Sequence, residues 1–392
     1  MRDPQTTFDY KHVGGRFLGL VASALAAYAA IFAGAACDAR QFAFSYLFAF
    51  AFFFTLCMGG LFWILVHHAV DAEWSVVFRR QLENLAALLV VLAVLFLPLV
   101  FVAPKLWSWM QIPPGTDTLL DEKWPYLTPW FFWMRAAFYF AFFVLAATWL
   151  RANSILQDSD GAPRYTVFNR RIAFASLPLF AVCLTFSAID WLMGLDYRWF
   201  STMWGVYVFA GSALGALCVL VLIVTALRGA GYFQGVITPE HYHVIGKLMF
   251  AFTIFWAYIG FSQYMLIWYA NIPEETIYFL RRNTESWQIL STALVAGHFL
   301  VPFLLLLPRS GKRNPSFLCG VAVWILAMHL LDIYLVVLPA LHQAGVALSW
   351  MDFACLAAIG CTLAAAFLKL LGDVPLWPLR DPRLEKSLAL KN

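Results

Sequence analysis

Charged side chains are scarce in this chain: Asp, Glu, Lys and Arg make up 12% of its 392 residues, whereas a typical soluble domain has about 25%. Hydrophobic residues account for 62%. No polar region is long enough for a soluble domain of ordinary size, because the longest polar gap runs from about residue 104 to 128. The composition therefore excludes a water-soluble protein and predicts an integral membrane protein.

The seven cysteines follow none of the spacings that bind inorganic cofactors. Neither C-x-x-C nor C-x-x-C-H occurs, so the ligand patterns of iron–sulfur clusters, zinc and c-type haem are missing. We expect no metal site, no covalently bound cofactor and no nucleic-acid partner. Packing within the membrane is the expected role of these cysteines.

Apolar stretches of about 20 residues, the length that crosses a bilayer, recur along the whole chain. There are ten: residues 17–36, 41–66, 84–103, 129–150, 172–193, 203–227, 244–269, 287–307, 317–339 and 350–371. They predict an all-α membrane protein with about ten transmembrane helices in a single membrane domain, residues 1–392. Because Lys and Arg gather in the loops on one side, the positive-inside rule predicts that both termini are cytoplasmic.

The chain also carries signs of an internal duplication. YLFAFAFFFTLC at 46–57 aligns with YVFAGSALGALC at 207–218, and a basic pair precedes Asp190 and Asp332 by the same nineteen residues. Matches in this order predict two parallel four-helix bundles, residues 41–193 and 203–339, flanked by the first and last spans. Asp332 is then the counterpart of Asp190.

Candidate functional residues inside the predicted spans are Arg135, Asp190, His298, His329 and Asp332. A charged side chain at the centre of a spanning helix costs about 2.5–3.5 kcal/mol, so a function or a partner should offset it. We expect Arg135 to pair with Asp190, and His298 to pair with Asp332 through His329. A carboxylate beside an imidazole suits proton relay. The alternative is a polar clamp that holds the helices in register.

A second group of titratable residues lies at the predicted cytoplasmic ends of two spans. These residues could feed an inner half-channel for protons, or they could be solvated helix ends. They are His67, His68, Asp71, Glu240, His241, His243 and Lys247. A further alternative, b-type haem between His298 and His329, would need these imidazoles on facing helices.

Two long stretches resemble a known family. FSAIDWLMGLDYRWFSTMWGVYVFAGS at 186–212 and GKLMFAFTIFWAYIGFSQYMLIWYANIPEET at 246–276 are similar to the second NrfD-like membrane subunit, the ActF type, of bacterial alternative complex III, and the resemblance extends over all ten spans. It implies a non-autonomous subunit of a quinol:cytochrome c oxidoreductase in the bacterial inner membrane. Such complexes oxidise quinol and pass its electrons to a periplasmic acceptor.

The resemblance also implies partners and ligands. Haem and iron–sulfur clusters would belong to partner subunits: multihaem cytochromes c and an iron–sulfur, molybdopterin-like periplasmic subunit, beside a sister NrfD-like membrane subunit and lipids. Quinone or quinol is the possible ligand, with Gln263, His298, His329 and Asp332 as candidate quinone contacts. The long loop at 105–130 is a candidate docking loop. A stand-alone proton-coupled transporter and a structural anchor without a quinone site are the competing hypotheses.

Overall fold

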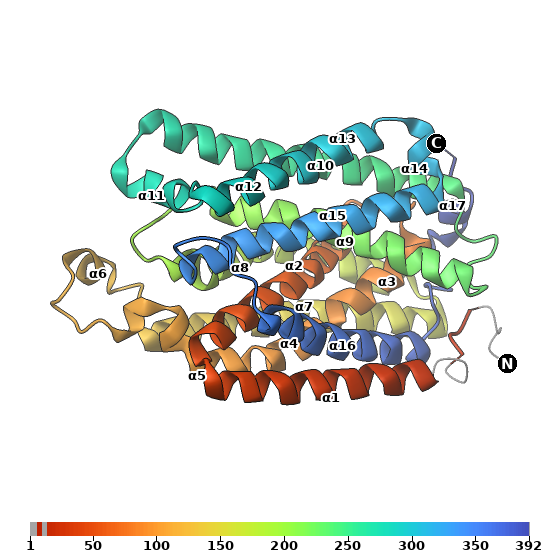
Figure 1. Cartoon of the computed structure of the whole chain (residues 1–392). Helices are drawn as coiled ribbons and strands as arrows, with labels where there is room; N and C mark the ends of the chain where they lie inside the picture. Colours follow the sequence, from red (N-terminus) through yellow and green to blue (C-terminus); the bar gives the residue numbers. More distant parts are fainter. Residues whose placement is uncertain (1–5, 10–13, 392) are drawn as a thin grey trace.

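The computed structural model describes residues 6–9 and 14–391, and predictions that fall on the remaining residues lie outside it. Within this part of the chain, nine helices are long and apolar enough to cross a membrane, and a bent helix pair makes a tenth if it counts as one span. The helices lie side by side with their long axes roughly aligned (Figure 1). The predicted all-α multi-span membrane fold is confirmed.

Eight long unbroken helices form most of the bundle. They are α1 (Gly14–Cys37), α2 (Ala39–Ala69), α7 (Pro129–Asp160), α8 (Pro163–Trp191), α9 (Trp204–Gly229), α10 (Pro239–Ala270), α15 (Pro315–Val337) and α16 (Trp350–Asp373). Four of them begin with proline, whose fixed φ suits the first helical position and whose missing N–H has no partner there anyway. Asp38 caps α2 by accepting hydrogen bonds from the amides of Arg40 and Gln41.

Two further spans are interrupted. The predicted span at 84–103 is instead α3 (Val76–Ala87), α4 (Leu89–Leu95) and α5 (Leu97–Leu106), with a bend of 60° between α4 and α5. Pro98, in the first turn of α5, lacks the N–H that would continue the helix. The predicted span at 287–307 consists of α12 (Glu285–Leu294), a π-helical segment η4 (Val295–Leu300) and α13 (Val301–Leu306).

Short helices lie between the spans. At the end of the bundle opposite the chain termini, hereafter the far end, are η2 (Ser108–Gln111), α6 (Thr118–Lys123), η3 (Met193–Leu195), α11 (Pro273–Arg281) and η5 (Leu338–Ala340). At the other end, hereafter the terminal end, are α14 (Arg309–Arg313) and α17 (Leu384–Leu388). The residues around Thr7 lie here as well, where Thr7 pairs with Pro375.

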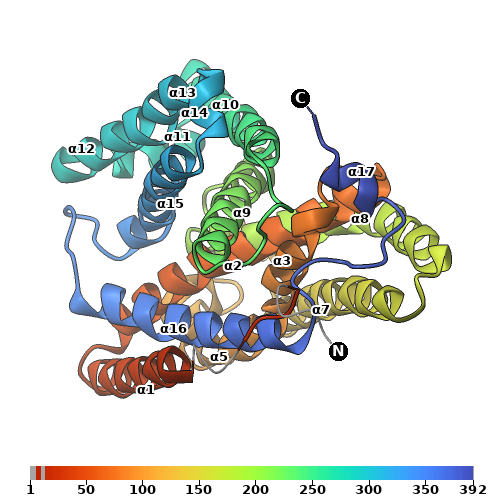
Figure 2. The same ribbon diagram turned by 90° about the vertical axis from the view of Figure 1, so that its right-hand side faces the viewer.

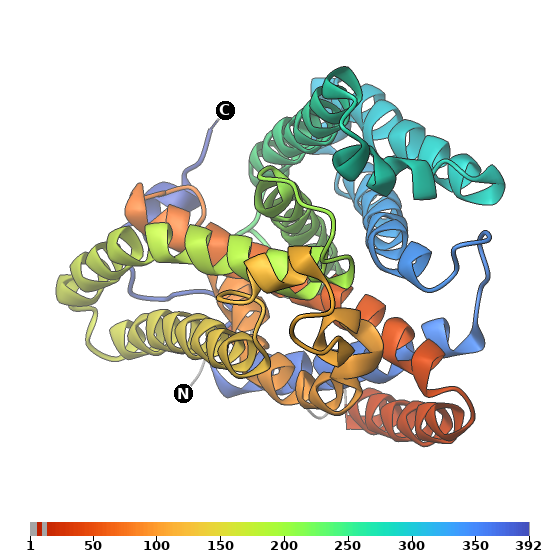
Figure 3. The same ribbon diagram turned by 90° about the vertical axis from the view of Figure 1, so that its left-hand side faces the viewer.

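The helices α2 and α9 pack against each other at the centre of the protein. Gly59 lets them approach closely, because a Cβ at this position would overlap the carbonyl oxygen of Ser212. Helices α3, α8 and α16 pack around α2, helices α10 and α15 pack on α9, and α1 packs on α16 at the side (Figures 2 and 3). Most of α2 is buried by protein, so its apolar residues contact other helices.

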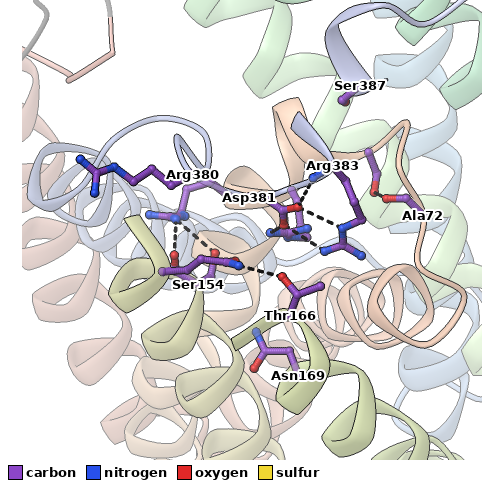
Figure 4. A network of polar contacts seen from close by, with 12 residues as sticks. Ala72, Ser154, Thr166, Asn169, Arg380, Asp381, Arg383 and Ser387 are labelled. Carbon is purple, nitrogen blue, oxygen red and sulfur yellow. Dashed lines mark hydrogen bonds and ion pairs between the residues drawn. The ribbon is translucent and has the colours of Figure 1, made fainter. Parts of the chain in front are cut away.

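The C-terminal segment, residues 374–391, folds back over the terminal end. Asp381 accepts hydrogen bonds from Arg79 and Arg383, and the amide of Gln81 donates to the carbonyl of Leu376 at 2.6 Å. Figure 4 shows Arg380, Asp381 and Arg383 of this segment close to Ser154 of α7. Ion pairs and hydrogen bonds therefore hold the segment against α3 and α7.

Candidate functional site

Asp332, in the part of α15 near the far end, is 3% exposed and held by two neutral side chains. The hydroxyl of Tyr207 in α9 donates to its Oδ1, and the indole N–H of Trp256 in α10 donates to Oδ2 at 3.1 Å. No cation among the described residues pairs with Asp332. A buried carboxylate without a cation can be neutralised only by a proton.

His329 lies one turn before Asp332 and is also buried, at 2% exposed. Its Nε2 is 2.9 Å from the hydroxyl of Thr55 in α2. Thr55 already donates its single hydroxyl hydrogen to the carbonyl of Phe52, so Nε2 carries the proton and donates to Thr55. The other ring nitrogen, Nδ1, has no hydrogen-bond partner among the described residues.

His298 completes the cluster from the π-helical segment η4. Its ring is fully buried and packs against Trp256, with 4.1 Å between ring centroids, and its centroid lies 6.2 Å from that of His329. Neither of its ring nitrogens has a hydrogen-bond partner in the described part of the chain. Single π turns are frequent at functional sites, and this one carries a buried imidazole.

We call His298, His329 and Asp332 the histidine–aspartate cluster. The structure brings the three residues together, but the predicted pairing of His298 with Asp332 through His329 is wrong. His329 donates to Thr55 rather than to Asp332, whose oxygens are taken by Tyr207 and Trp256. The two side chains point in different directions. Residues at i and i+3 lie on one face of a helix, but His329 points toward α2 and Asp332 points toward α9 and α10.

Asp190 is held very differently. Arg135 donates to it through Nε at 2.9 Å and Nη2 at 2.8 Å, as predicted, and the hydroxyls of Tyr126 and Tyr139 donate to it as well. Burial, and then the neighbouring Asp190 carboxylate, raise the pKa of Tyr126, so its hydroxyl stays protonated as a donor. The four hydrogen bonds and the guanidinium make Asp190 a fixed polar clamp between α7 and α8.

A small cavity lies between the two aspartate sites. It has a volume of about 10 Å³ and is lined by Thr55 of α2, Ser187 and Trp191 of α8, and apolar side chains. This is roughly the space that one water molecule needs. The indole N–H of Trp191 is buried there without a partner among the described residues. Thr55 therefore borders both this cavity and the histidine–aspartate cluster.

At the terminal end, His67 and His68 are 2% and 1% exposed. The alternative of a solvated helix end is thus wrong for both, because the turn after α2 and the C-terminal segment cover them. None of their ring nitrogens has a partner in the described residues. Asp71 is half-buried and pairs with Arg170 and Arg383.

The other terminal-end candidates lie on the first turns of α10. His241 is fully buried, accepts the backbone N–H of Thr238 through Nδ1 and contacts the carbonyl of Ser387 through Nε2, 3.1 Å away. Glu240 pairs with Arg313, and His243 is buried 3.9 Å from Glu240. Lys247 is exposed. The alternative of a solvated helix end is therefore confirmed for Lys247 and wrong for His241 and His243.

Gln263 is buried in α10, seven residues beyond Trp256 and hence about 10 Å farther along the helix. It shares a helix face with the Trp256 that contacts the cluster. Sequence reasoning missed three residues that contact the cluster directly, namely Thr55, Tyr207 and Trp256. Tyr207 had a signal, because it opens the duplicated motif aligned with Tyr46.

The packing does not fit haem between His298 and His329. Phe52 and Trp256 contact the two rings, and a Cβ on Gly211 would lie 2.9 Å from Cε1 of His329, so the α9 backbone meets the ring edge. A macrocycle would need this space. Among the residues that the structure describes, no group of three His, Cys, Asp or Glu side chains is arranged to hold a metal ion.

A scan of protein-family models finds no match to this chain, and a search of curated proteins finds no matching sequence.

Proposed function

We propose that the chain is a membrane subunit of a quinol:cytochrome c oxidoreductase of the alternative complex III type, in the bacterial inner membrane with both termini cytoplasmic. In this proposal the histidine–aspartate cluster accepts protons released by quinol oxidation. Quinol loses two electrons and two protons: the electrons pass to iron–sulfur and multihaem partner subunits, and His298 and Asp332 take up the protons.

The observation that carries the proposal is the contrast between the two buried aspartates. Asp190 has a guanidinium as its counter-charge, whereas Asp332 has only a phenol and an indole N–H. Two imidazoles with unpartnered nitrogens lie beside Asp332. Buried polar groups are normally hydrogen-bonded, so a cluster that keeps free nitrogen atoms is suited to exchanging protons rather than to holding helices together.

A route toward the terminal end would begin at Thr55. This residue contacts His329 and borders the small cavity, and His67 and His68 lie twelve and thirteen residues farther along α2. At 1.5 Å per residue this separation is about 18–20 Å. The histidine–aspartate cluster and this buried histidine pair would be the two ends of an inner half-channel.

The first experiment is purification of the tagged full-length chain from native membranes. Co-purification with iron–sulfur and multihaem subunits is expected. Isolation as a lone membrane protein would reject membership of the oxidoreductase and leave the stand-alone proton-coupled transporter, which proton flux into liposomes containing only this chain would test.

The two helix interruptions lie in spans three and eight, which do not correspond in the duplication, whereas a transporter core built on paired breaks would place them at matching sites.

The second experiment is Asp332→Asn in the purified complex. We expect a loss of about tenfold or more in quinol oxidation and coupled proton release, because general acid–base groups contribute about 10²–10⁴-fold. Asp352→Asn is the matched control: Asp352 is also a buried carboxylate, 2% exposed, but it caps α16 and bonds Ser45. Unchanged turnover and proton release in the Asp332 variant would reject the relay and favour an anchoring role.

A further inference from the structure

A cleft of about 300 Å³ lies at the far end of the bundle, away from the histidine–aspartate cluster. Its walls come from the start of α2, the end of α5 and its following loop, the loop after η3, the end of α11, and the segment at 340–343. Figure 3 looks onto this end of the protein. The first four-helix unit and the second both contribute to it, so the cleft depends on how the two units pack.

The charges that line the cleft are mostly positive. Four cations, Arg40, Lys105, Arg198 and Arg281, face a single acid, Asp196, which gives a formal charge of four minus one, or +3. Asp196 is already the ion-pair partner of Arg281. Arg198 lies 3.6 Å from Asp117, so Arg40 and Lys105 are the two lining cations without an ion-pair partner among the described residues.

The cations differ in how firmly they are held. Arg198 is oriented by the hydroxyl of Tyr197 at 3.2 Å and by Asp117 at 3.6 Å. Arg40 and Lys105 are exposed, and neither has an ion-pair partner in residues 6–9 and 14–391. The nearby carboxylate of Asp38 accepts the amides of Arg40 and Gln41 through its Oδ1.

We propose that this cleft binds a phosphate-bearing anion, either the headgroup of an anionic phospholipid or free phosphate. Arginine and lysine are the side chains that bind phosphate oxygens, arginine through two parallel hydrogen bonds. Arg40 is the second residue of the spanning helix α2, and Lys105 is in the last turn of α5, so both lie at the level where lipid headgroups meet a spanning helix. The volume suits a headgroup or a small anion.

The test uses the full chain and the double variant Arg40→Gln/Lys105→Gln. One arm titrates inorganic phosphate into the protein in a neutral detergent and measures heat of binding. The other arm exchanges phosphatidylglycerol against phosphatidylcholine and counts retained lipids by native mass spectrometry. Arg164→Gln is the control, because Arg164 is 71% exposed and pairs with Asp160 between α7 and α8.

We expect the double variant to lose about tenfold or more in affinity for the anion, since charge-assisted hydrogen bonds are among the stronger ones, while the control keeps wild-type binding. Loss of phosphatidylglycerol retention identifies a lipid headgroup, and loss of phosphate binding alone identifies a free anion. Binding equal to wild type in the double variant, or no preference for anions in the wild type, overturns the proposal. Lys105→Gln alone repeats the test should the double variant fold poorly.

Discussion

The hydroxyl of Thr55 in α2 lies 2.9 Å from Nε2 of His329 in α15, so a hydrogen bond joins α2 to the histidine–aspartate cluster. Thr55 is 1% exposed. Because its hydrogen is committed to the carbonyl of Phe52, it acts toward His329 as an acceptor and fixes the ring with Nδ1 free.

Thr55→Val keeps the shape of this side chain and removes the acceptor. The N–H of His329 would then be buried without a partner, which costs about 1–3 kcal/mol. We expect the free energy of unfolding in detergent to fall by that amount. Thr253→Val is the control, because the buried Thr253 hydroxyl bonds only the carbonyl of Met249 in its own helix. An equal loss in both variants would show that the Thr55–His329 contact has no special weight.

Gly211→Ala tests the fit of His329 against α9. The added Cβ would lie 2.9 Å from Cε1 of the ring, closer than atoms pack, so the ring or the helix must move. Overpacking of this kind costs about 1–3 kcal/mol, and we expect a lower melting temperature. The control is Gly320→Ala in α15, where a Cβ meets nothing within 4 Å. A Gly211 variant as stable as the wild type would contradict the close approach.

Arg135→Gln tests the clamp. It leaves the Asp190 carboxylate buried with only two phenol donors, and breaking a buried pair in this way costs about 3–5 kcal/mol. Arg135→Met combined with Asp190→Leu removes both charges, and we expect it to be more stable than either Arg135→Met or Asp190→Leu alone. A double-mutant cycle of unfolding free energies measures the coupling. Additive losses would mean that the two side chains do not stabilise each other.

The terminal end should respond to acid through Asp381. Burial alone would raise the pKa of this carboxyl, but Arg79 and Arg383 outweigh burial and hold the pKa well below its ordinary value. Since the folded-state pKa is depressed, the contribution to stability is complete above the unfolded value of about 3.9 and is lost as pH falls toward the folded value. The hydrogen-exchange protection factors of residues 376–390, which correct for the intrinsic pH dependence of exchange, should be unchanged between pH 7 and 5 and lower below about pH 4.

Asp381→Asn should release the segment at neutral pH, because it removes the charge that Arg79 and Arg383 share. Lys386→Gln serves as the control, since its pair with Glu73 is exposed at the surface and surface pairs contribute about 0–1 kcal/mol. Protection of the segment that persists in the Asp381 variant would assign its attachment to other contacts.

The spans could be predicted because a long apolar stretch is by itself enough to indicate a membrane-crossing helix. The Arg135–Asp190 pair could be predicted because a lone buried charge needs a partner. The partners of Asp332 could not be predicted. Trp256 sits in an apolar span where aromatic residues pack against lipid and protein alike, so its N–H gives no sequence signal, and the alignment of Tyr207 with Tyr46 does not point to Asp332. Only the relative rotation of α9, α10 and α15 aims Tyr207 and Trp256 at the carboxylate.

The basic residues at the terminal end show a second limit. Arg79 and Arg80 fit the positive-inside pattern, which predicts solvated side chains, yet they are 1% and 0% exposed. Arg79 pairs with Glu83 of the same helix and with Asp381 of the C-terminal segment, and Arg80 pairs with Glu83 and with Asp158 of α7. The spacing of charges along the helix could predict the pairs with Glu83. The pair of Arg79 with Asp381 depends instead on the path of the C-terminal segment over the bundle.

The π-helical segment at Val295–Leu300 has a consequence for how this span tolerates insertions and deletions. A π turn is an α-helix that holds one extra residue. Deleting one residue between Val295 and His298 would let the segment return to α geometry without turning α12 relative to α13, because the residue removed is the extra one that the π turn holds. The helix would stay long enough to cross the bilayer, but the wide turn that carries the imidazole of His298 would be lost.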